Sequence, residues 1–143
     1  MTHIHRSAIL PYSDEKMFAL VNDVGAYPDF LQGCAGVDIH EASETAMLAT
    51  LYLEKRGIKF QFTTKNSLEA PKSIRMSLQD GPFDSLSGHW FFQRLEENAC
   101  KVILDIEFSL SKRLVSLASK KLFDNVSHNM VDSMIARARS LYG

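Results

Sequence analysis

The sequence predicts one α+β domain over residues 1–143, in which a curled antiparallel sheet of about seven strands surrounds a long C-terminal helix. Three observations predict this fold. Apolar and polar residues alternate over several short runs, turn-forming residues separate these runs, and the apolar period becomes helical after residue 110. A chain of 143 residues with 45% apolar residues can also bury a substantial core without disulfide bonds.

The N-terminal region is predicted to form one strand followed by a short helical segment. Ser13 is suited to cap a helix running from Asp14 to about Asp23, because an oxygen-bearing side chain satisfies free amides at a helix start and acidic residues favour its positive end. Pro28 limits how far this helix continues, since the residue before a proline disfavours helical geometry.

Five further runs have the period of two that is typical of strands with one buried face. The longest is 100–110, where six apolar residues share one face and Lys101, Asp105, Glu107 and Ser109 lie on the other. The other runs are 47–53, 58–63, 74–79 and 86–92. Turn-forming residues lie between them at Arg56-Gly57, Ala70-Pro71, Asp80-Gly81-Pro82 and Glu97-Asn98. We therefore expect an antiparallel meander with one apolar and one solvated face.

The C-terminal region, from Leu114 to Leu141, has apolar residues at helical spacing and contains no glycine or proline. Such a helix must bury its stripe against the sheet, and a curled sheet around a straight helix favours a ligand cavity between them. Large apolar side chains on both elements are the candidate ligand contacts, although the same side chains also suit plain core packing. They are Tyr27, Phe30, Phe60, Phe62, Met76, Trp90, Phe92, Leu104, Ile106, Phe123, Met130 and Met134.

Composition excludes several classes of protein. A formal net charge of −1 does not suit a protein that wraps nucleic acid over its whole surface, and we expect no DNA partner. No secretory signal peptide and no apolar run of membrane-spanning length occur, so a cytoplasmic protein is expected. Cys34 and Cys100 are then expected to be reduced thiols that serve as small apolar residues.

No catalytic or metal-binding group is predicted. Glycine-rich phosphate loops, nucleophile elbows and zinc-protease motifs are all missing from the sequence. His3 and His5 share a strand face, but we interpret them as solvated surface residues rather than metal ligands. The same surface interpretation applies to the remaining titratable candidates, which are His89, His128, Asp105 and Glu107.

Near-neutrality conceals an uneven distribution of charge. From Ser111 onward the chain has six basic residues and two acidic ones. This basic face has three interpretations, namely a solvated helix surface, contact with ribosomal RNA, or docking to an anionic membrane. Aromatic residues are not interleaved with the charges, so reading of an RNA sequence is not expected. The six basic residues are Lys112, Arg113, Lys120, Lys121, Arg137 and Arg139.

Several sequence segments together form a recognisable pattern, and they include Pro11-Tyr12-Ser13, Tyr27-Pro28-Asp29-Phe30-Leu31, Phe62-Thr63-Thr64-Lys65-Asn66, Asp80-Gly81-Pro82-Phe83 and Leu86-x-Gly88-x-Trp90-x-Phe92. With these segments the chain resembles the coenzyme Q-binding START-domain family of the polyketide cyclase/dehydrase-like SRPBCC superfamily, including its bacterial ribosome-association toxin branch. Gln32 and Ser119-Lys120 depart from the family pattern, which has proline at the first position and an aromatic–glycine pair at the second.

This resemblance implies a helix-grip (START/Bet v 1-like) fold and a non-enzymatic function that requires no cofactor. The first expectation is a cavity that binds ubiquinone or a similar isoprenoid lipid and supports respiration. The alternative is a ribosome-association toxin that binds the large ribosomal subunit and blocks subunit joining, and the third is a polyketide cyclase-like enzyme. A quinone head needs a polar partner, for which Tyr12, Tyr27, Asn66 and Arg75 stay open.

Overall fold

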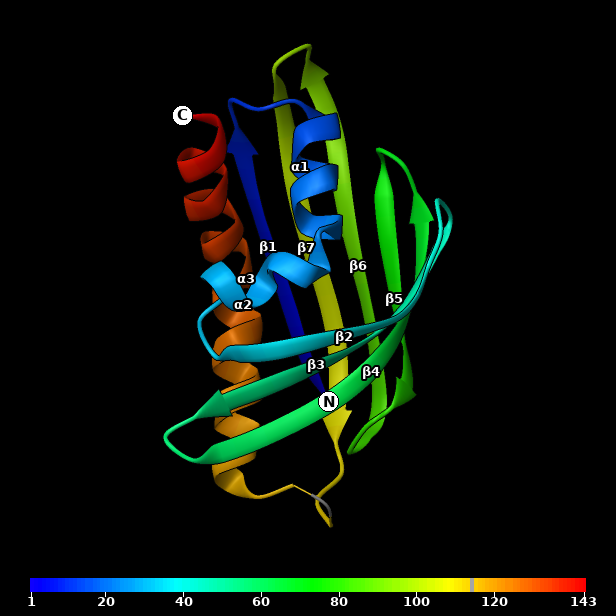
Figure 1. The fold of residues 1–143 in the computed structure, drawn as a ribbon, viewed down its shortest axis with the longest axis vertical. Helices are drawn as coiled ribbons and strands as arrows, with labels where there is room; N and C mark the ends of the chain where they lie inside the picture. Colours follow the sequence, from blue (N-terminus) through cyan, green and yellow to red (C-terminus); the bar gives the residue numbers. More distant parts are fainter. Residues whose placement is uncertain (114) are drawn as a thin grey trace.

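The computed structural model describes residues 1–113 and 115–143. Seven strands and the long helix follow the predicted order, with three short helices after the first strand (Figure 1). The elements are β1 (Thr2–Leu10), α1 (Asp14–Asn22), the 3₁₀ helix η1 (Val24–Ala26), α2 (Tyr27–Phe30), β2 (Cys34–Ala42), β3 (Ala46–Lys55), β4 (Ile58–Glu69), β5 (Ser73–Asp80), β6 (Phe83–Glu96), β7 (Ala99–Leu110) and α3 (Leu117–Tyr142).

All seven strands form one antiparallel sheet in the order β1-β7-β6-β5-β4-β3-β2. The sheet curls so strongly that β2, β3 and β4 run across β1, β7 and β6 in Figure 1, while α3 lies along the opening. The predicted α+β helix-grip architecture is therefore confirmed.

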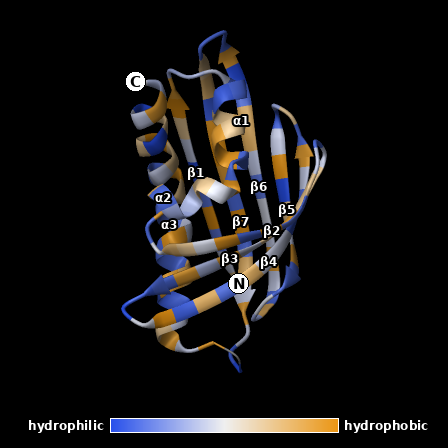
Figure 2. Cartoon of the chain, in the orientation of Figure 1, coloured by the Kyte–Doolittle hydropathy of each residue, from blue (hydrophilic) through white to orange (hydrophobic). Residues whose placement is uncertain are grey.

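Strand alternation places the core on the inner face of this sheet. In β7, Cys100, Val102, Leu104, Ile106 and Phe108 are all at most 5% exposed, whereas the residues between them are at least partly exposed. Figure 2 shows the same alternation of apolar and polar residues along the strands. The pattern that predicted the strands is thus the pattern that builds the core.

The first helix begins where its capping residue predicts. The Ser13 Oγ atom accepts a hydrogen bond from the Lys16 backbone N–H at 3.1 Å. Two residues of α1, Met17 and Val21, are fully buried, and the helix ends at Asn22. The chain continues as η1 and α2, with Pro28 as the second residue of α2, where a missing N–H costs no hydrogen bond.

The long helix begins later than its apolar pattern predicts. Ser116 caps α3 by accepting a hydrogen bond from the Ser119 backbone N–H at 3.1 Å, and the helix starts at Leu117. Leu114, where the stripe was predicted to begin, lies outside the described residues. Leu117 and Leu141 are 71% and 52% exposed, so only the part of the stripe between Leu122 and Ala138 reaches the core.

Strand β2 has no counterpart among the runs singled out in the sequence. It is an edge strand in which only Cys34 is buried, and two irregularities interrupt its register with β3. A strand that buries neither face has no alternation to detect, and bulges are a common way to protect a sheet edge from pairing.

Candidate functional site

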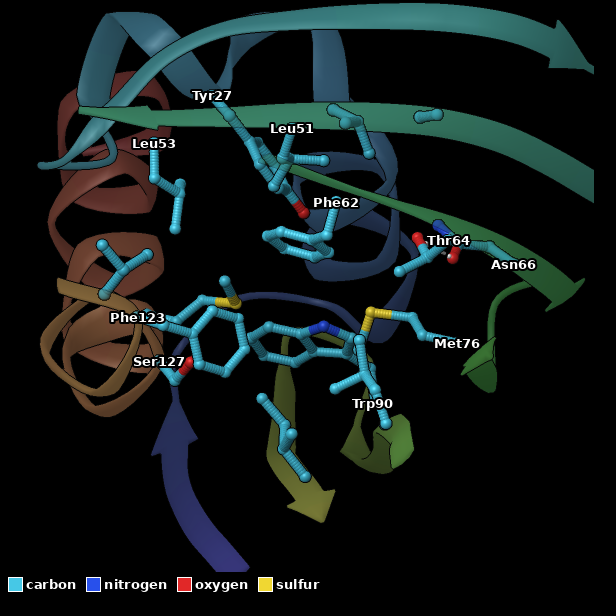
Figure 3. A pocket seen from close by; sticks show the side chains of 17 residues that line it. Tyr27, Leu51, Leu53, Phe62, Thr64, Asn66, Met76, Trp90, Phe123 and Ser127 are labelled. Atoms are coloured by element: carbon cyan, nitrogen blue, oxygen red, sulfur yellow. Dashed lines mark hydrogen bonds between the residues drawn. The ribbon is translucent and has the colours of Figure 1, made fainter. Parts of the chain in front are cut away.

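The inner face of the sheet and α3 enclose an apolar cavity of about 60 Å³ (Figure 3). Strands β3, β4, β5, β6 and β7 supply one wall, and α3 supplies the other through Phe123, Val126, Ser127 and Met130. Tyr27 of α2 reaches the cavity from the side of the short helices. The cavity therefore lies where the curled sheet and the straight helix diverge, as the fold predicts.

Seven of the twelve predicted ligand contacts line this cavity, and their binding of a ligand stays a prediction. The other five do not line it. Phe92 packs edge-to-face against Phe18 of α1 at 5.6 Å between ring centroids, and Leu104 and Met134 are at most 1% exposed within the core. The seven that line the cavity are Tyr27, Phe62, Met76, Trp90, Ile106, Phe123 and Met130.

The remaining two predicted contacts have other packing partners. Phe60 belongs to a cluster with Phe62, Phe83, Phe108 and Phe123, in which neighbouring ring centroids lie 4.8 to 6.4 Å apart. Phe30 lies beneath the guanidinium of Arg137, at 5.1 Å. The aromatic residues therefore divide between plain core packing and cavity lining, and the two interpretations of the sequence both apply.

Ten lining residues were not among the predicted contacts. Most are smaller aliphatic side chains, and the alternation in 47–53 placed three of them on the inner face of a strand. The prediction favoured large aromatic and methionine side chains and considered Asn66 only as a partner for a quinone head, although cavity walls need small residues as well as large ones. They are Val24, Ala49, Leu51, Leu53, Thr64, Asn66, Leu86, Gly88, Val126 and Ser127.

Two polar residues of β4 face this apolar space together. The Thr64 hydroxyl donates to the Asn66 Oδ1 atom at 3.0 Å, and both residues are about 5–6% exposed (Figure 3). Tyr27 donates its hydroxyl to the Val21 carbonyl, and burial raises the pKa of that phenol. Of the four candidate partners for a quinone head, only Tyr27 and Asn66 line the cavity.

The other two candidates lie elsewhere. Tyr12 packs against Tyr142 with ring centroids 5.7 Å apart, and Arg75 is exposed on the outer face of β5. Because the Tyr27 hydroxyl already donates to a backbone carbonyl, Asn66 is the side chain with the most hydrogen-bonding capacity toward a molecule in the cavity.

Of the titratable residues that were interpreted as surface groups, His3, His5, Asp105 and Glu107 lie on the outer face of the sheet. His89 is on the same face of β6 but is half-buried, and His128 is exposed on α3. His3 contacts Asp105 through its Nε2 atom, and His5 Nδ1 lies 3.7 Å from the same carboxylate oxygen. The hydrogen bond raises the pKa of His3 and lowers the pKa of Asp105. Within residues 1–113 and 115–143, no group of three histidine, cysteine or acidic side chains has the geometry to hold a metal ion.

Both cysteines are buried free thiols. Burial raises the pKa of Cys100 to about 11 and also raises the pKa of Cys34. Because the thiolate is the reactive form, these residues have the character of small apolar core groups.

The basic C-terminal residues form two groups rather than one continuous face. Lys112, Arg113, Lys120 and Lys121 lie before and within the first turns of α3, and Arg137 and Arg139 lie in its last turns. The middle of the helix carries Asp124 and Asp132, and Arg6 of β1 pairs with Asp132 at 2.9 Å. Along the described chain, no helix is both long and apolar enough to span a bilayer.

A curled sheet closed by a long helix around an apolar cavity defines the START-like class of proteins. Residues 10–135 match the model of the family described as polyketide cyclase / dehydrase and lipid transport, and the chain belongs to this family. The resemblance predicted from the sequence motifs is thereby confirmed.

Relatives named for ribosome association match the whole chain. It is 48% identical over 143 residues to the ribosome association toxin RatA of Vibrio cholerae, with 100% of this chain and 99% of that protein covered. A Pseudomonas aeruginosa protein of the same name is 44% identical over 142 residues, with 99% of both chains covered. A mitochondrial coenzyme Q-binding protein of Drosophila melanogaster is 23% identical over 142 residues, which cover 96% of this chain and 59% of that protein.

Solved structures show the same fold at low sequence identity. The Zhui aromatase/cyclase from Streptomyces sp. R1128 superimposes with a TM-score of 0.80 at 16% identity, covering 96% of this chain and 93% of that one. A START superfamily protein from Mycobacterium smegmatis has a TM-score of 0.79 at 19% identity, with coverages of 97% and 98%. At these identities the likeness establishes the fold alone.

Proposed function

We propose that this protein associates with the ribosome and, by binding the large subunit, hinders the joining of the two subunits without catalysing a reaction. One observation carries the proposal. Proteins 44–48% identical over essentially the whole chain are named ribosome association toxins, whereas the coenzyme Q-binding relative is 23% identical and is only partly covered. Ribosome association was the alternative in the sequence analysis, and it now ranks first.

The distribution of charge supports this proposal. From Ser111 onward the chain has six basic residues and two acidic ones. Four of the six, Lys112, Arg113, Lys120 and Lys121, lie before and within the first turns of α3, and contact with the phosphate groups of ribosomal RNA requires such clustered positive charge. The near-neutral chain therefore has a region suited to this partner, although its total charge does not indicate one.

A second candidate function is binding of a small apolar molecule in the cavity. The volume of about 60 Å³ is less than half of the ~150 Å³ that holds benzene in an engineered cavity. A quinone ring therefore enters only if lining side chains move. Met76 and Met130 are the unbranched, flexible residues able to do so. The cavity supports ligand binding of the START type, but it favours ubiquinone less than the sequence led us to expect.

A cyclase-like activity ranks third. In the part of the chain that the structure describes, the cavity wall contains no carboxylate, imidazole or amine. Its polar side chains are Tyr27, Thr64, Asn66 and Ser127, together with the indole N–H of Trp90. General acid–base catalysis needs a group whose pKa lies near the working pH, and burial moves the pKa of Tyr27 away from that range.

Ribosome profiles test the first proposal. The protein is expressed in a bacterial host at increasing levels, and the lysate is separated on a sucrose gradient at moderate salt. We expect the protein to migrate with the large subunit, and the ratio of free subunits to whole ribosomes to rise with its concentration. An unchanged ratio, with all of the protein at the top of the gradient, would contradict ribosome association.

Mass spectrometry of the organic extract tests the second candidate. Protein purified from the same host is compared with the variant Gly88→Ala, whose new Cβ atom would lie 2.5 Å from the Met76 Cε atom and force that methyl group to move. We expect an apolar compound to be enriched with the wild-type protein and depleted with the variant. Equal recovery from both proteins would argue against occupancy of the cavity.

A further inference from the structure

The tip of the β3–β4 hairpin and the first turns of α3 bring basic residues together at one end of the molecule (Figure 1). Lys55 and the α3 residues Leu122 and Asn125 line one hollow of about 410 Å³. Lys112 and Lys120 line a second hollow of about 310 Å³ around the start of α3. We call this surface the basic end, and it comprises Lys55, Arg56, Lys112, Arg113, Lys120 and Lys121.

Charges of the basic end are not neutralised by ion pairs. Within the described residues, none of its six cations forms a salt bridge, whereas Arg6 pairs with Asp132 and Arg137 lies over the ring of Phe30. Glu54 and Asp124 are the acidic residues that adjoin it along the chain. The first turn of α3 contains no acidic residue, so its free N–H groups add to the positive potential. Six available cations at one end suit a polyanion.

Arg56 provides a second, independent observation. It has φ of 52°, the only positive φ at a residue other than glycine in the described chain. Lys55 pairs with Ile58, so Arg56 and Gly57 form a two-residue turn with positive φ at both positions, where asparagine followed by glycine is favoured. An arginine at such a position is conformationally costly, and costly backbone positions gather at functional sites.

The hollow beside Lys55 has the chemistry of a phosphate contact. Its wall includes the amide side chains of Gln32, Asn125 and Asn129, and it contains no aromatic residue. Amides and lysines donate hydrogen bonds to phosphate and sugar oxygens, whereas recognition of single-stranded bases relies on aromatic stacking. Gly33 brings the chain close to α3, because a Cβ atom there would lie 2.7 Å from Val126 Cγ2.

From these observations we infer that the basic end docks on the sugar–phosphate backbone of ribosomal RNA, while Arg137 and Arg139 at the far end of α3 do not take part. The inference rests on the proposed ribosome association and assigns its contact surface. Leu117 is exposed beside the same cations, and an apolar side chain next to basic residues also suits an anionic membrane. The experiment must therefore distinguish RNA from a membrane as the partner.

Binding of purified large ribosomal subunits is measured by co-sedimentation at several salt concentrations. The variants are Lys121→Gln and Arg56→Asn, and the matched control is Arg139→Gln. Lys121 and Arg139 are about 18 residues apart, which places them on the same helical face about 27 Å from each other. Thermal unfolding of each variant shows that it is folded. Vesicles of phosphatidylglycerol and phosphatidylcholine form a second binding arm.

We expect Lys121→Gln and Arg56→Asn each to weaken subunit binding several-fold and to lower the slope of log affinity against log salt by about 0.7–0.9. Arg139→Gln should bind like the wild type. Wild-type affinity in both basic-end variants, or an equal loss of affinity in Arg139→Gln, would show that the basic end is not the contact surface. Either result would leave ribosome association itself intact. Vesicle binding as strong as subunit binding, and equally sensitive to Lys121→Gln, would overturn RNA as the partner. Absence of binding by the wild type would instead overturn the proposed function itself.

Discussion

Replacement of Arg56 by asparagine should stabilise the protein while it weakens ribosome binding. Arg56 has φ of 52° in a two-residue turn whose second residue is Gly57. A left-handed conformation costs an ordinary residue roughly 1–2 kcal/mol, and asparagine tolerates it because its short polar side chain bonds locally. We therefore expect the free energy of unfolding to rise by about 1 kcal/mol, which corresponds to about 3 °C in Tm for a chain of this length.

Fluorescence of Trp90 reports this change directly. It is the protein's one tryptophan and is 1% exposed, so its emission changes when the core opens. Unfolding in urea gives the free energy, and the same samples are used for co-sedimentation with large subunits. The variant Arg56→Ala separates the two effects, since it removes the guanidinium without favouring the turn. The reasoning would be refuted if Arg56→Asn lowered the free energy of unfolding, or if Arg56→Ala bound subunits like the wild type.

Three further predictions concern buried and paired side chains. Asn66→Leu leaves the Thr64 hydroxyl without its acceptor, so urea unfolding should show a loss of about 1–3 kcal/mol, and an unchanged midpoint would contradict the buried pair. Cys100 should react with a thiol reagent only after unfolding, because it is fully buried and its pKa is raised to about 11. The pairing of His3 with Asp105 raises the histidine pKa and lowers the carboxyl pKa, so its stabilisation should be greatest between about pH 4 and 6.5. This stabilisation should decline as pH falls through the Asp105 pKa or rises through the His3 pKa. The measurement is the difference in Tm between the wild type and Asp105→Asn, and a difference that stays constant with pH would contradict the prediction.

The strands were predictable where one face is buried and the other is not. Residues 100–110 alternate, with Ile103 as the one apolar residue on the outer face, because β7 lies within the sheet between β1 and β6 and has its inner side chains in the core. Strand β2 was missed for the complementary reason, since its side chains meet solvent on both faces. The start of α3 was placed too early, at Leu114, because apolar spacing does not reveal that Ser116 caps the helix. Periodicity also did not distinguish the exposed Leu117 from a core residue.

Membership of the cavity wall was only partly predictable. Periodicity shows which face a side chain is on, but the position along the strand decides whether it meets empty space or another element. Trp90 and Phe92 share the inner face of β6, yet Trp90 lines the cavity and Phe92 packs on Phe18 of α1. Likewise, Lys55 and Asn125 line one hollow although they are far apart in the sequence, and no local pattern predicts that proximity.

Helix α3 is common to the cavity and to the basic end, which raises the question of whether they act independently. Its inner face contributes Phe123 and Met130 to the cavity, and its outer surface contributes Lys121 to the basic end and Asn125 to the hollow beside it. If α3 is rigidly held, Gly88→Ala, which displaces the flexible Met76 methyl group on the sheet side, should deplete any bound apolar molecule and leave subunit binding unchanged.

The packing of Gly33 bears on that independence. A Cβ atom at Gly33 would lie 2.7 Å from the Val126 Cγ2 atom, so the chain beside the outer hollow packs directly on a side chain of α3 that also lines the cavity. Co-sedimentation of Gly88→Ala with large subunits measures the coupling, with Lys121→Gln as the variant that must lose affinity in the same assay. A parallel loss of subunit binding in Gly88→Ala, at unchanged Tm, would show that the cavity controls the position of α3 and that the ligand regulates ribosome association.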